Sequence, residues 1–275
     1  MQPFASGPAE TGAARPLVMG ILNVTPDSFF DGGRHDTAAA AIEWGRRMLG
    51  EGADVIDVGG ESSRPGARPV PFEEELRRVL PVVASLAGAA ASAGGRVSID
   101  TMKPEVAAAA LEEGATLVND VACRCAEVAA AGGAGIVVMH MQGSPETMQR
   151  DPRYGEVVAE VRAFLDGAAS DAVAAGVGEV YVDPGIGFGK TLEHNVALLE
   201  ALPELVADGR PVVVGASRKS FLGRLAARAG APPLPAEERL EASLAVATYA
   251  MAAGAAMVRV HDVAETAQAA RLVGR

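Results

Sequence analysis

The chain has little cysteine and few aromatic residues, and both shortages narrow the class of protein. Its 275 residues include two cysteines, Cys123 and Cys125, and 4% aromatic residues. Cysteines separated by one residue form only a strained disulfide, and two thiols do not make a zinc site. A disulfide scaffold and a zinc centre are therefore not supported, and we expect two small, semi-buried free thiols.

Positive charge is also scarce. The chain has 24 Lys and Arg residues against 35 Asp and Glu residues, which gives a formal net charge of −11. Affinity for DNA and RNA comes mainly from neutralising phosphates, so we expect no nucleic-acid partner. An anionic small substrate would need a local cluster of cations on this acidic background.

Long apolar runs are missing as well. The runs at 17–24 and 136–141 are too short to cross a bilayer, and no basic start followed by an apolar run marks a secretory signal. We therefore expect a cytoplasmic protein that makes no membrane contact. Residues 1–15 are small, polar and rich in Gly, Ala and Pro, and predict a flexible tail before one domain over 16–275.

Strand-like and helix-like segments alternate along the chain. Short apolar runs that suit strands buried on both faces lie at Leu17–Val24, Asp54–Gly59, Arg96–Asp100, Thr116–Asp120, Gly135–His140, Val180–Asp183, Pro211–Gly215 and Met257–His261. Helical segments rich in Ala, Leu, Glu and Arg lie at Thr37–Gly50, Phe72–Ala93, Glu156–Ala175 and Arg239–Ala253. Glycine often stands between a helix and the next strand, where a helix end belongs. This alternation predicts a parallel sheet.

Polar residues at the strand ends decide between a closed and an open sheet. They are Asn23, Asp57, Asp100, Asn119, His140, Asp183, Lys219 and His261. In a barrel, functional residues come from the carboxyl ends of many strands, whereas an open sheet gathers them near one switch point. We therefore predict an α/β fold, a (β/α)8 TIM barrel in a single domain. Any one of these Asp or Asn residues could instead cap the following helix.

Nucleotide-binding motifs are missing from the expected places. No G-x-G-x-x-G follows the first strand, and no P-loop occurs. The sequence GIGFGK at Gly185–Lys190 comes late and lacks the helix-opening third glycine. We do not expect this segment to bind a nucleotide.

Two loops carry candidate binding groups. The segment Gly20–Gly33 leaves its strand at Asn23, and its Phe29 and Phe30 either cover a bound flat ring or pack the loop down. The segment DVGGESSRPGA, which starts at Asp57, presents two hydroxyls and a guanidinium together. That set suits a phosphate or carboxylate clamp, and the alternative is an ordinary surface loop with a solvated arginine.

Three strand ends carry the groups that a flat heterocycle needs. Asp100 and Asp183 accept hydrogen bonds, and Asn119 both donates and accepts. Converging in one pocket, they would suit a ring with several N–H donors.

Cations gather at two further strand ends. Lys219 and Ser220 stand where a strand leads into a helix, whose free N–H groups bind anions. Arg259 and His261 alternate with valine, so both point to the same side of a strand. Together with Arg64 they form the local basic cluster that an acidic protein needs for an anionic substrate. The alternative is a helix cap with solvated cations.

Seven motifs resemble those of the dihydropteroate synthase family in sequence, order and spacing. They are MGILNVTPDSFFDGG, DVGGESSRPGA, VND, MHMQG, VDPGIGFGK, GASRKS and RVHD, and the resemblance covers about residues 17–272. It implies a transferase of folate biosynthesis, which condenses 7,8-dihydropterin-6-ylmethyl diphosphate with 4-aminobenzoate to give 7,8-dihydropteroate and diphosphate. It also implies competition by sulfonamides at the second pocket, and a homodimer.

The resemblance assigns residue roles. For the pterin it implies Asp100, Asn119, Asp183, Lys219 and Arg259. For diphosphate it implies Asn23, Ser63, Arg64, Arg259 and His261, with Asn23 also a ligand of Mg2+. For 4-aminobenzoate it implies Pro65, Phe188 and Ser220. The catalytic residues would be Asp100, Lys219 and Arg259. Ser63 stands where the family more often has threonine.

The expected chemistry is loss of diphosphate to a pterin cation that Asp100 stabilises, followed by attack of the amine. No covalent enzyme nucleophile is needed, and we expect diphosphate to bind before 4-aminobenzoate. Two alternatives remain open. A pterin-binding methyltransferase barrel would share the acids and the amide but lack the cation cluster, and a non-catalytic paralogue would keep the fold without turnover.

Overall fold

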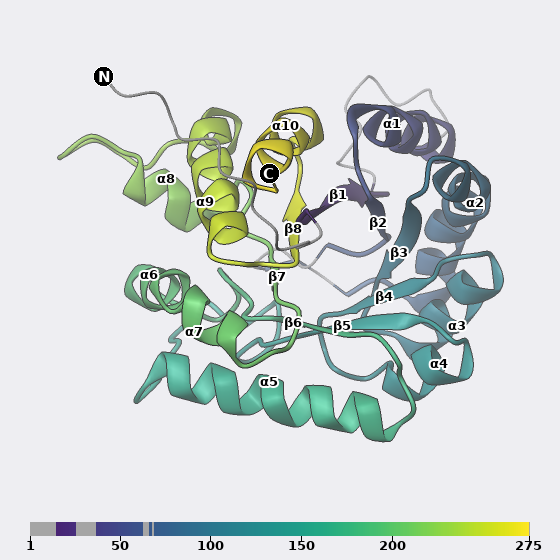
Figure 1. Cartoon of the computed structure of the whole chain (residues 1–275), viewed down its shortest axis with the longest axis horizontal. Coiled ribbons are helices and arrows are strands. Elements are labelled where there is room, and N and C mark those ends of the chain that lie inside the picture. The colour runs from purple at the N-terminus through teal and green to yellow at the C-terminus, as the bar shows by residue number, and fades with distance from the viewer. Residues whose placement is uncertain (1–14, 26–36, 63–65, 68, 275) are drawn as a thin grey trace, which may run out of the picture.

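The strands form a cylinder with the helices around it (Figure 1). The computed structural model describes residues 15–25, 37–62, 66–67 and 69–274. The strands are β1 Leu17–Asn23, β2 Val55–Gly59, β3 Arg96–Asp100, β4 Leu117–Asp120, β5 Gly135–Met139, β6 Val180–Asp183, β7 Val213–Val214 and β8 Met257–Val260. They form one parallel sheet in the order β6-β5-β4-β3-β2-β1-β8-β7.

The two ends of this sheet meet at β6 and β7. Val182 forms a parallel bridge with Val212, and its N–H donates to the carbonyl of Pro211 at 3.0 Å. The seam is thinner than the rest of the sheet, since β7 has two residues and pairs with β8 only at Val213 and Val214. The predicted (β/α)8 barrel is confirmed.

All eight predicted strands and all four predicted helices are confirmed, with bounds that differ by at most two residues. The helices are α1 Thr37–Glu51, α2 Phe72–Ser92, α3 Pro104–Glu112, α4 Ala126–Ala131, α5 Val157–Ala174, α6 Leu192–Glu200, α7 Leu202–Ala207, α8 Ser220–Leu225, α9 Leu240–Ala252 and α10 Val263–Val273, with a 3-10 turn at Ala236–Glu238. We did not predict α3, α4, α6, α7 and α10, because 6 to 11 residues give too few turns for a clear periodic pattern.

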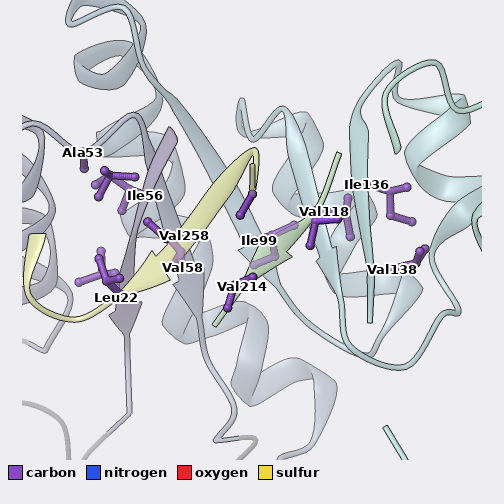
Figure 2. Close-up of a cluster of buried hydrophobic side chains, with 14 of the residues drawn as sticks. Leu22, Ala53, Ile56, Val58, Ile99, Val118, Ile136, Val138, Val214 and Val258 are labelled. Carbon is purple, nitrogen blue, oxygen red and sulfur yellow. The ribbon is translucent and has the colours of Figure 1, made fainter. Parts of the chain in front are cut away.

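Alternate residues of each strand face opposite sides of the cylinder wall. The outward side chains, among them Ile56, Ile99, Val118 and Val258 (Figure 2), are buried in one apolar cluster together with side chains of the helices. Burying one such side chain contributes about 1.5–3 kcal/mol, so this layer is the main source of the barrel's stability.

The inward side chains fill the barrel with a second, smaller apolar cluster. Its buried members are Met19, Val55, Leu117, Val137, Tyr181, Val213 and Met257. Because this layer closes the interior, the polar side chains further along the strands gather at the carboxyl end, where barrel enzymes hold their sites. Within the described residues, no helix is long and apolar enough to cross a membrane.

The predicted tail lies outside the described residues except for Arg15. Its guanidinium donates to both carboxylate oxygens of Asp54, at 2.6 and 2.9 Å, and the second of these oxygens also accepts the N–H of Val18. This contact fixes the chain at the start of β1.

Candidate active site

Four polar side chains enter the barrel mouth because of strand alternation. Asp57, Asn119, Asp183 and Arg259 each lie two residues beyond a member of the inward apolar cluster, so they face the same interior. Asp100, at the end of β3, reaches the same place and bonds to Arg259. The side chains come from five different strands of one sheet.

Arg259 is the centre of this group. Its Nε donates to Asp57 Oδ2 at 2.6 Å, and its NH2 donates to Asp100 Oδ2 at 2.5 Å. Asn119 Nδ2 donates to the same Asp57 oxygen at 3.0 Å. Burial alone would lower the pKa of Arg259, but the two carboxylates raise it above its usual value, so the guanidinium stays charged.

For Asp100, burial and the neighbouring Arg259 shift the pKa in opposite directions. Burial raises its pKa to about 7, while the neighbouring Arg259 lowers it and the nearby Asp57 raises it further. A buried carboxylate next to a second carboxylate is costly to ionise unless a cation is shared between them. Asp100 is therefore a titratable group of the site in the neutral pH range.

Lys219 connects the acids to the loop after β6. Its Nζ donates to the carbonyl of Ile186 and lies 4.2 Å from the centre of the Phe188 ring, a cation–π contact. Burial lowers the pKa of Lys219 to about 7, although the charge of Asp183 opposes this shift. Burial also raises the pKa of Asp183, whose Oδ1 accepts the N–H of Gly185 at 2.7 Å.

Two successive residues of the loop after β7 contact two successive residues at the end of β8. Ser217 Oγ lies 3.0 Å from His261 Nδ1 and accepts the backbone N–H of His261 at 3.1 Å. Arg218 forms an ion pair with Asp262, so its charge is already paired with a carboxylate of the protein. Ser220, the first residue of α8, is exposed.

Asn23 ends β1 beside Gly59. A side chain at Gly59 would place its Cβ 3.7 Å from Asn23 Oδ1 and 3.6 Å from Asp100 Oδ2, so the missing side chain leaves room between these two groups. No group of three or more His, Cys, Asp or Glu residues within the described ranges is arranged to hold a metal ion.

The structure places most of the predicted site residues at this mouth. Asp100, Asn119, Asp183, Lys219 and Arg259 lie close to one another there. Asn23, Phe188, Ser220 and His261 lie at strand ends or in loops at the same end of the barrel. Ser63, Arg64, Pro65, Phe29 and Phe30 lie outside the described residues.

Sequence reasoning placed Asp57 at a strand end but assigned neither Asp57 nor Lys190 a role in the site. Asp57 is completely buried and is the shared acceptor of Arg259 and Asn119. Its position two residues before Gly59, on the inward face, was the available signal. Lys190 belongs to a quoted motif, but nothing in the sequence shows that its ammonium is buried.

The strand-end Asp120 and the two cysteines have structural roles. Asp120 accepts backbone N–H groups of Ala122, Arg124 and Cys125 at 2.6 to 3.2 Å, and so holds the turn between β4 and α4. Cys123 and Cys125 are both free, as predicted, and burial raises both thiol pKa values.

Comparison with known proteins identifies the family. A family model described as pterin binding enzyme matches residues 19–261. The dihydropteroate synthase of Escherichia coli (strain K12) is 44% identical over 279 aligned residues, covering 99% of this chain and 95% of the relative. The chain belongs to the dihydropteroate synthase family. That of Mycobacterium leprae (strain TN) is 48% identical over 265 residues, covering 94% of this chain and 92% of the relative.

Solved structures agree with this membership. The Yersinia pestis dihydropteroate synthase, in complex with a sulfonamide drug, has a TM-score of 0.85 and 43% identity, covering 94% of this chain and 93% of that one. The Xanthomonas albilineans enzyme, in complex with 7,8-dihydropteroate, has a TM-score of 0.81 and 43% identity, covering 94% and 92%. The predicted transferase of folate biosynthesis is confirmed, and the methyltransferase alternative is not favoured.

Proposed function

We propose that the barrel mouth of this family member condenses 7,8-dihydropterin-6-ylmethyl diphosphate with 4-aminobenzoate, giving 7,8-dihydropteroate and diphosphate. The observation that carries this proposal is the convergence of Asp100, Asp183, Lys219 and Arg259 at one end of the barrel. Arg259 bonds to Asp100, a Cβ at Gly215 would contact both Arg259 and Asp183, and Lys219 bonds to the loop that follows Asp183. Relatives whose structures hold 4-aminobenzoic acid, 7,8-dihydropteroate or a sulfonamide support it.

The acids and the amide are proposed to bind the pterin ring. The ring presents several N–H donors, which Asp100 and Asp183 are suited to accept. The bond from Asn119 Nδ2 to Asp57 fixes which way the Asn119 amide is turned. Lys219 supplies a cation at the ring edge, between the pterin and the second substrate.

The diphosphate needs more positive charge than Lys219 and Arg259 supply. The three carboxylates Asp57, Asp100 and Asp183 outnumber the two cations Lys219 and Arg259 when all are ionised. An anion with several negative charges would be repelled by a net negative mouth. We therefore propose further cations there.

Mg2+, Arg64 and His261 are the proposed additional cations. The amide oxygen of Asn23 fits Mg2+, which prefers oxygen ligands and is usually held by one or two protein groups together with substrate phosphates. When bound, Mg2+ would neutralise charge on the departing diphosphate. Ser63 is proposed to donate its hydroxyl to the same diphosphate.

The proposed reaction proceeds through a pterin cation. The bond from the pterin methylene carbon to the diphosphate oxygen breaks, and the carboxylate of Asp100 stabilises the cation that forms. The amine of 4-aminobenzoate then attacks this carbon. Asp100, Lys219 and Arg259 are the proposed catalytic residues, and none of them forms a covalent bond to the substrate.

The second substrate is proposed to bind beside Phe188. Phe188 and Pro65 would flank its ring, and the exposed hydroxyl of Ser220 at the start of α8 would take its carboxylate. We propose ordered binding, with diphosphate first. Calorimetric titration of a sulfonamide with and without diphosphate tests this order, and equal affinity in both titrations would contradict it.

A turnover assay tests the function as a whole. We expect the wild-type chain, with both substrates and Mg2+, to form 7,8-dihydropteroate and release diphosphate in equal amounts, and the Asp183→Asn variant to lose most of this activity. Pterin binding without turnover in the wild type would instead assign the chain as a non-catalytic paralogue.

A homodimer and a cytoplasmic location complete the proposal. Tyr249 on α9 and Leu225 on α8 are large apolar side chains that are 46% and 50% exposed, and these helices contact each other. Sedimentation velocity should show a dimer that Tyr249→Glu weakens. The free thiols Cys123 and Cys125 suit a reducing compartment.

A further inference from the structure

The loop between β6 and α6 has every carbonyl from residue 185 to residue 189 engaged as a hydrogen-bond acceptor. The donors to Gly185, Ile186, Gly187, Phe188 and Gly189 are, in that order, Lys190, Lys219, Gln149, Lys190 and Tyr154. All five of these bonds come from side chains, and two come from one ammonium. Only one conformation of such a loop satisfies all these hydrogen bonds at once.

Lys190 is the central donor. Its side chain is 3% exposed, and its Nζ lies 2.9 Å from the carbonyl of Gly185, 3.0 Å from that of Phe188 and 2.9 Å from Nδ1 of His140. Three close acceptors match the three N–H bonds of an ammonium. Burial lowers the pKa of His140 to about 4, so its ring is neutral, and in the tautomer protonated at Nε2 its Nδ1 accepts from Lys190.

The loop is also pressed against the end of β5. A Cβ at Gly185 would lie 1.8 Å from the carbonyl oxygen of His140, and one at Gly189 would lie 2.5 Å from that of Gln142. The backbone therefore has no room to move towards β5, and the Lys190 ammonium, which also contacts His140, holds it there. Phe188, between these two glycines, is held with its ring against the Lys219 cation.

We propose that Lys190 is a positioning residue for the second substrate: by holding the carbonyls of Gly185 and Phe188, it fixes the wall of the 4-aminobenzoate pocket. This inference rests on the proposed function of that pocket. Lys190 acts through the loop and touches neither substrate. A purely structural role would lower stability and affect both substrates alike, whereas a positioning role changes the KM for 4-aminobenzoate selectively.

The main experiment compares Lys190→Met with a matched control, Arg96→Met. Arg96 donates to Glu179 at 2.7 and 2.8 Å at the amino end of the barrel, so its loss removes a partly buried ion pair far from the mouth. For Lys190→Met we expect the KM for 4-aminobenzoate to rise roughly tenfold, because the buried carbonyl of Phe188 loses its donor and that of Gly185 keeps only the Phe188 N–H. The KM for the pterin diphosphate should stay within about twofold. Arg96→Met should lower Tm and leave both KM values unchanged.

Tyr154→Phe is the milder second variant, for use where Lys190→Met does not fold. It removes one donor to the same loop, at Gly189, and keeps the ring that packs against His140 and His194. We expect a smaller rise in the KM for 4-aminobenzoate, about two- to threefold, as for one lost hydrogen bond. An unchanged KM in this variant, or an equal rise of both KM values in Lys190→Met, would overturn the inference.

Hydrogen–deuterium exchange separates failure of this inference from failure of the proposed function. The peptide covering 184–191 should exchange faster in Lys190→Met than in the wild type, and Arg96→Met should leave it unchanged. This readout needs no turnover. Unchanged exchange in Lys190→Met would overturn the anchoring role. If exchange is faster in Lys190→Met but the wild type shows no turnover, only the assignment of the pocket to 4-aminobenzoate is overturned.

Discussion

Single residues at the barrel mouth show how buried charges compensate one another. Arg259 contacts the carboxylates of Asp57 and Asp100, and these three groups lie on three different strands. Removing one partner from a buried charge group leaves the others uncompensated, which costs several kcal/mol. The neighbouring Arg259 therefore favours the ionised form of Asp100, while burial still raises the pKa of this carboxyl to about 7.

The first prediction concerns Asp100. Asp100→Asn should reduce kcat by roughly 100-fold or more, because it removes the charge opposite the developing cation. Burial raises the pKa of Asp100 to about 7, so the activity of the wild type should fall as the pH decreases below about 7 and the carboxylate is protonated. Initial rates between about pH 5.5 and pH 9 measure this limb.

The control for this limb is the variant itself. Asp100→Asn cannot titrate at this position, so its residual activity should lack the acid limb, while any alkaline limb from Lys219, whose pKa burial lowers to about 7, should persist. An acid limb of the same shape in both proteins would show that another group is responsible.

The second prediction concerns stability and His140. An unfolded chain protonates this histidine near pH 6.5, whereas burial lowers its pKa to about 4 in the folded protein. Between these values the unfolded state binds more protons, so the free energy of unfolding falls as the pH decreases from 6.5 towards 4. This contribution is complete above pH 6.5 and is lost at acid pH.

His140→Gln isolates that contribution. Glutamine keeps an acceptor for Lys190 and does not titrate, so its stability should depend less on pH in this window. Urea unfolding of both proteins at pH 7 and at pH 4.5 measures the difference. We expect the wild type to lose more stability than the variant, and equal losses would contradict the prediction.

Elements, rather than single side chains, determine the shape of the second pocket. The loop between β6 and α6 lies against the end of β5 and is bonded by residues of three neighbouring segments: the β5–α5 loop, α6 and the β7–α8 loop. Its glycines are needed where the backbone approaches His140 and Gln142 closely. This explains why a segment that looks like a glycine-rich nucleotide loop is instead held in one conformation beside the proposed second pocket.

The third prediction compares two glycines with similar backbone angles. Gly185 and Gly133 have φ values of 67° and 64°, but a Cβ at Gly133 meets no atom within 4 Å. Both alanine substitutions carry the left-handed backbone cost of roughly 1–2 kcal/mol. Only Gly185→Ala should also displace the loop and reduce kcat/KM for 4-aminobenzoate by roughly tenfold or more, because its Cβ would overlap the His140 carbonyl.

Urea unfolding and initial rates on the two variants test this comparison. A full kinetic effect of Gly133→Ala would show that backbone strain anywhere in the barrel is sufficient. An absence of effect in Gly185→Ala would show that the loop can move without loss of function.

A ligand that binds at this site stabilises the whole folded barrel. The site uses residues from strands at both ends of the sheet, so it exists only in the closed barrel. The fourth prediction is that 7,8-dihydropteroate at about 100 times its Kd raises the free energy of unfolding by about 2.7 kcal/mol. Tm should rise by several degrees, roughly 2–4 °C per kcal/mol for a domain of this size class.

Differential scanning calorimetry with and without the ligand measures the shift. Asp183→Asn is the matched variant, because it removes one proposed pterin contact and keeps the side-chain shape. Its Tm shift should be clearly smaller than that of the wild type at the same ligand concentration. An equal shift would place the ligand elsewhere on the protein.

Local patterns predicted the elements well where they are long or sharply bounded. The strands Arg96–Asp100 and Val180–Asp183 match their predicted bounds, because each is a short apolar run that ends at an acidic residue. The helix α4, with six residues, has too little periodicity to be recognised. Strand β7 is shorter than predicted, because pairing at the seam limits it, and pairing is a tertiary property.

The sequence by itself determined the alternation of strands and helices, the closed fold and the polar side chains at the strand ends, because periodicity and strand-end chemistry are local. Tertiary structure alone decided which of these groups bond. Arg259 is 202 residues from Asp57 and 159 from Asp100, and only barrel closure and strand register join them. It also decided that the Lys190 ammonium is buried against loop carbonyls, because burial depends on what the rest of the chain packs around a residue.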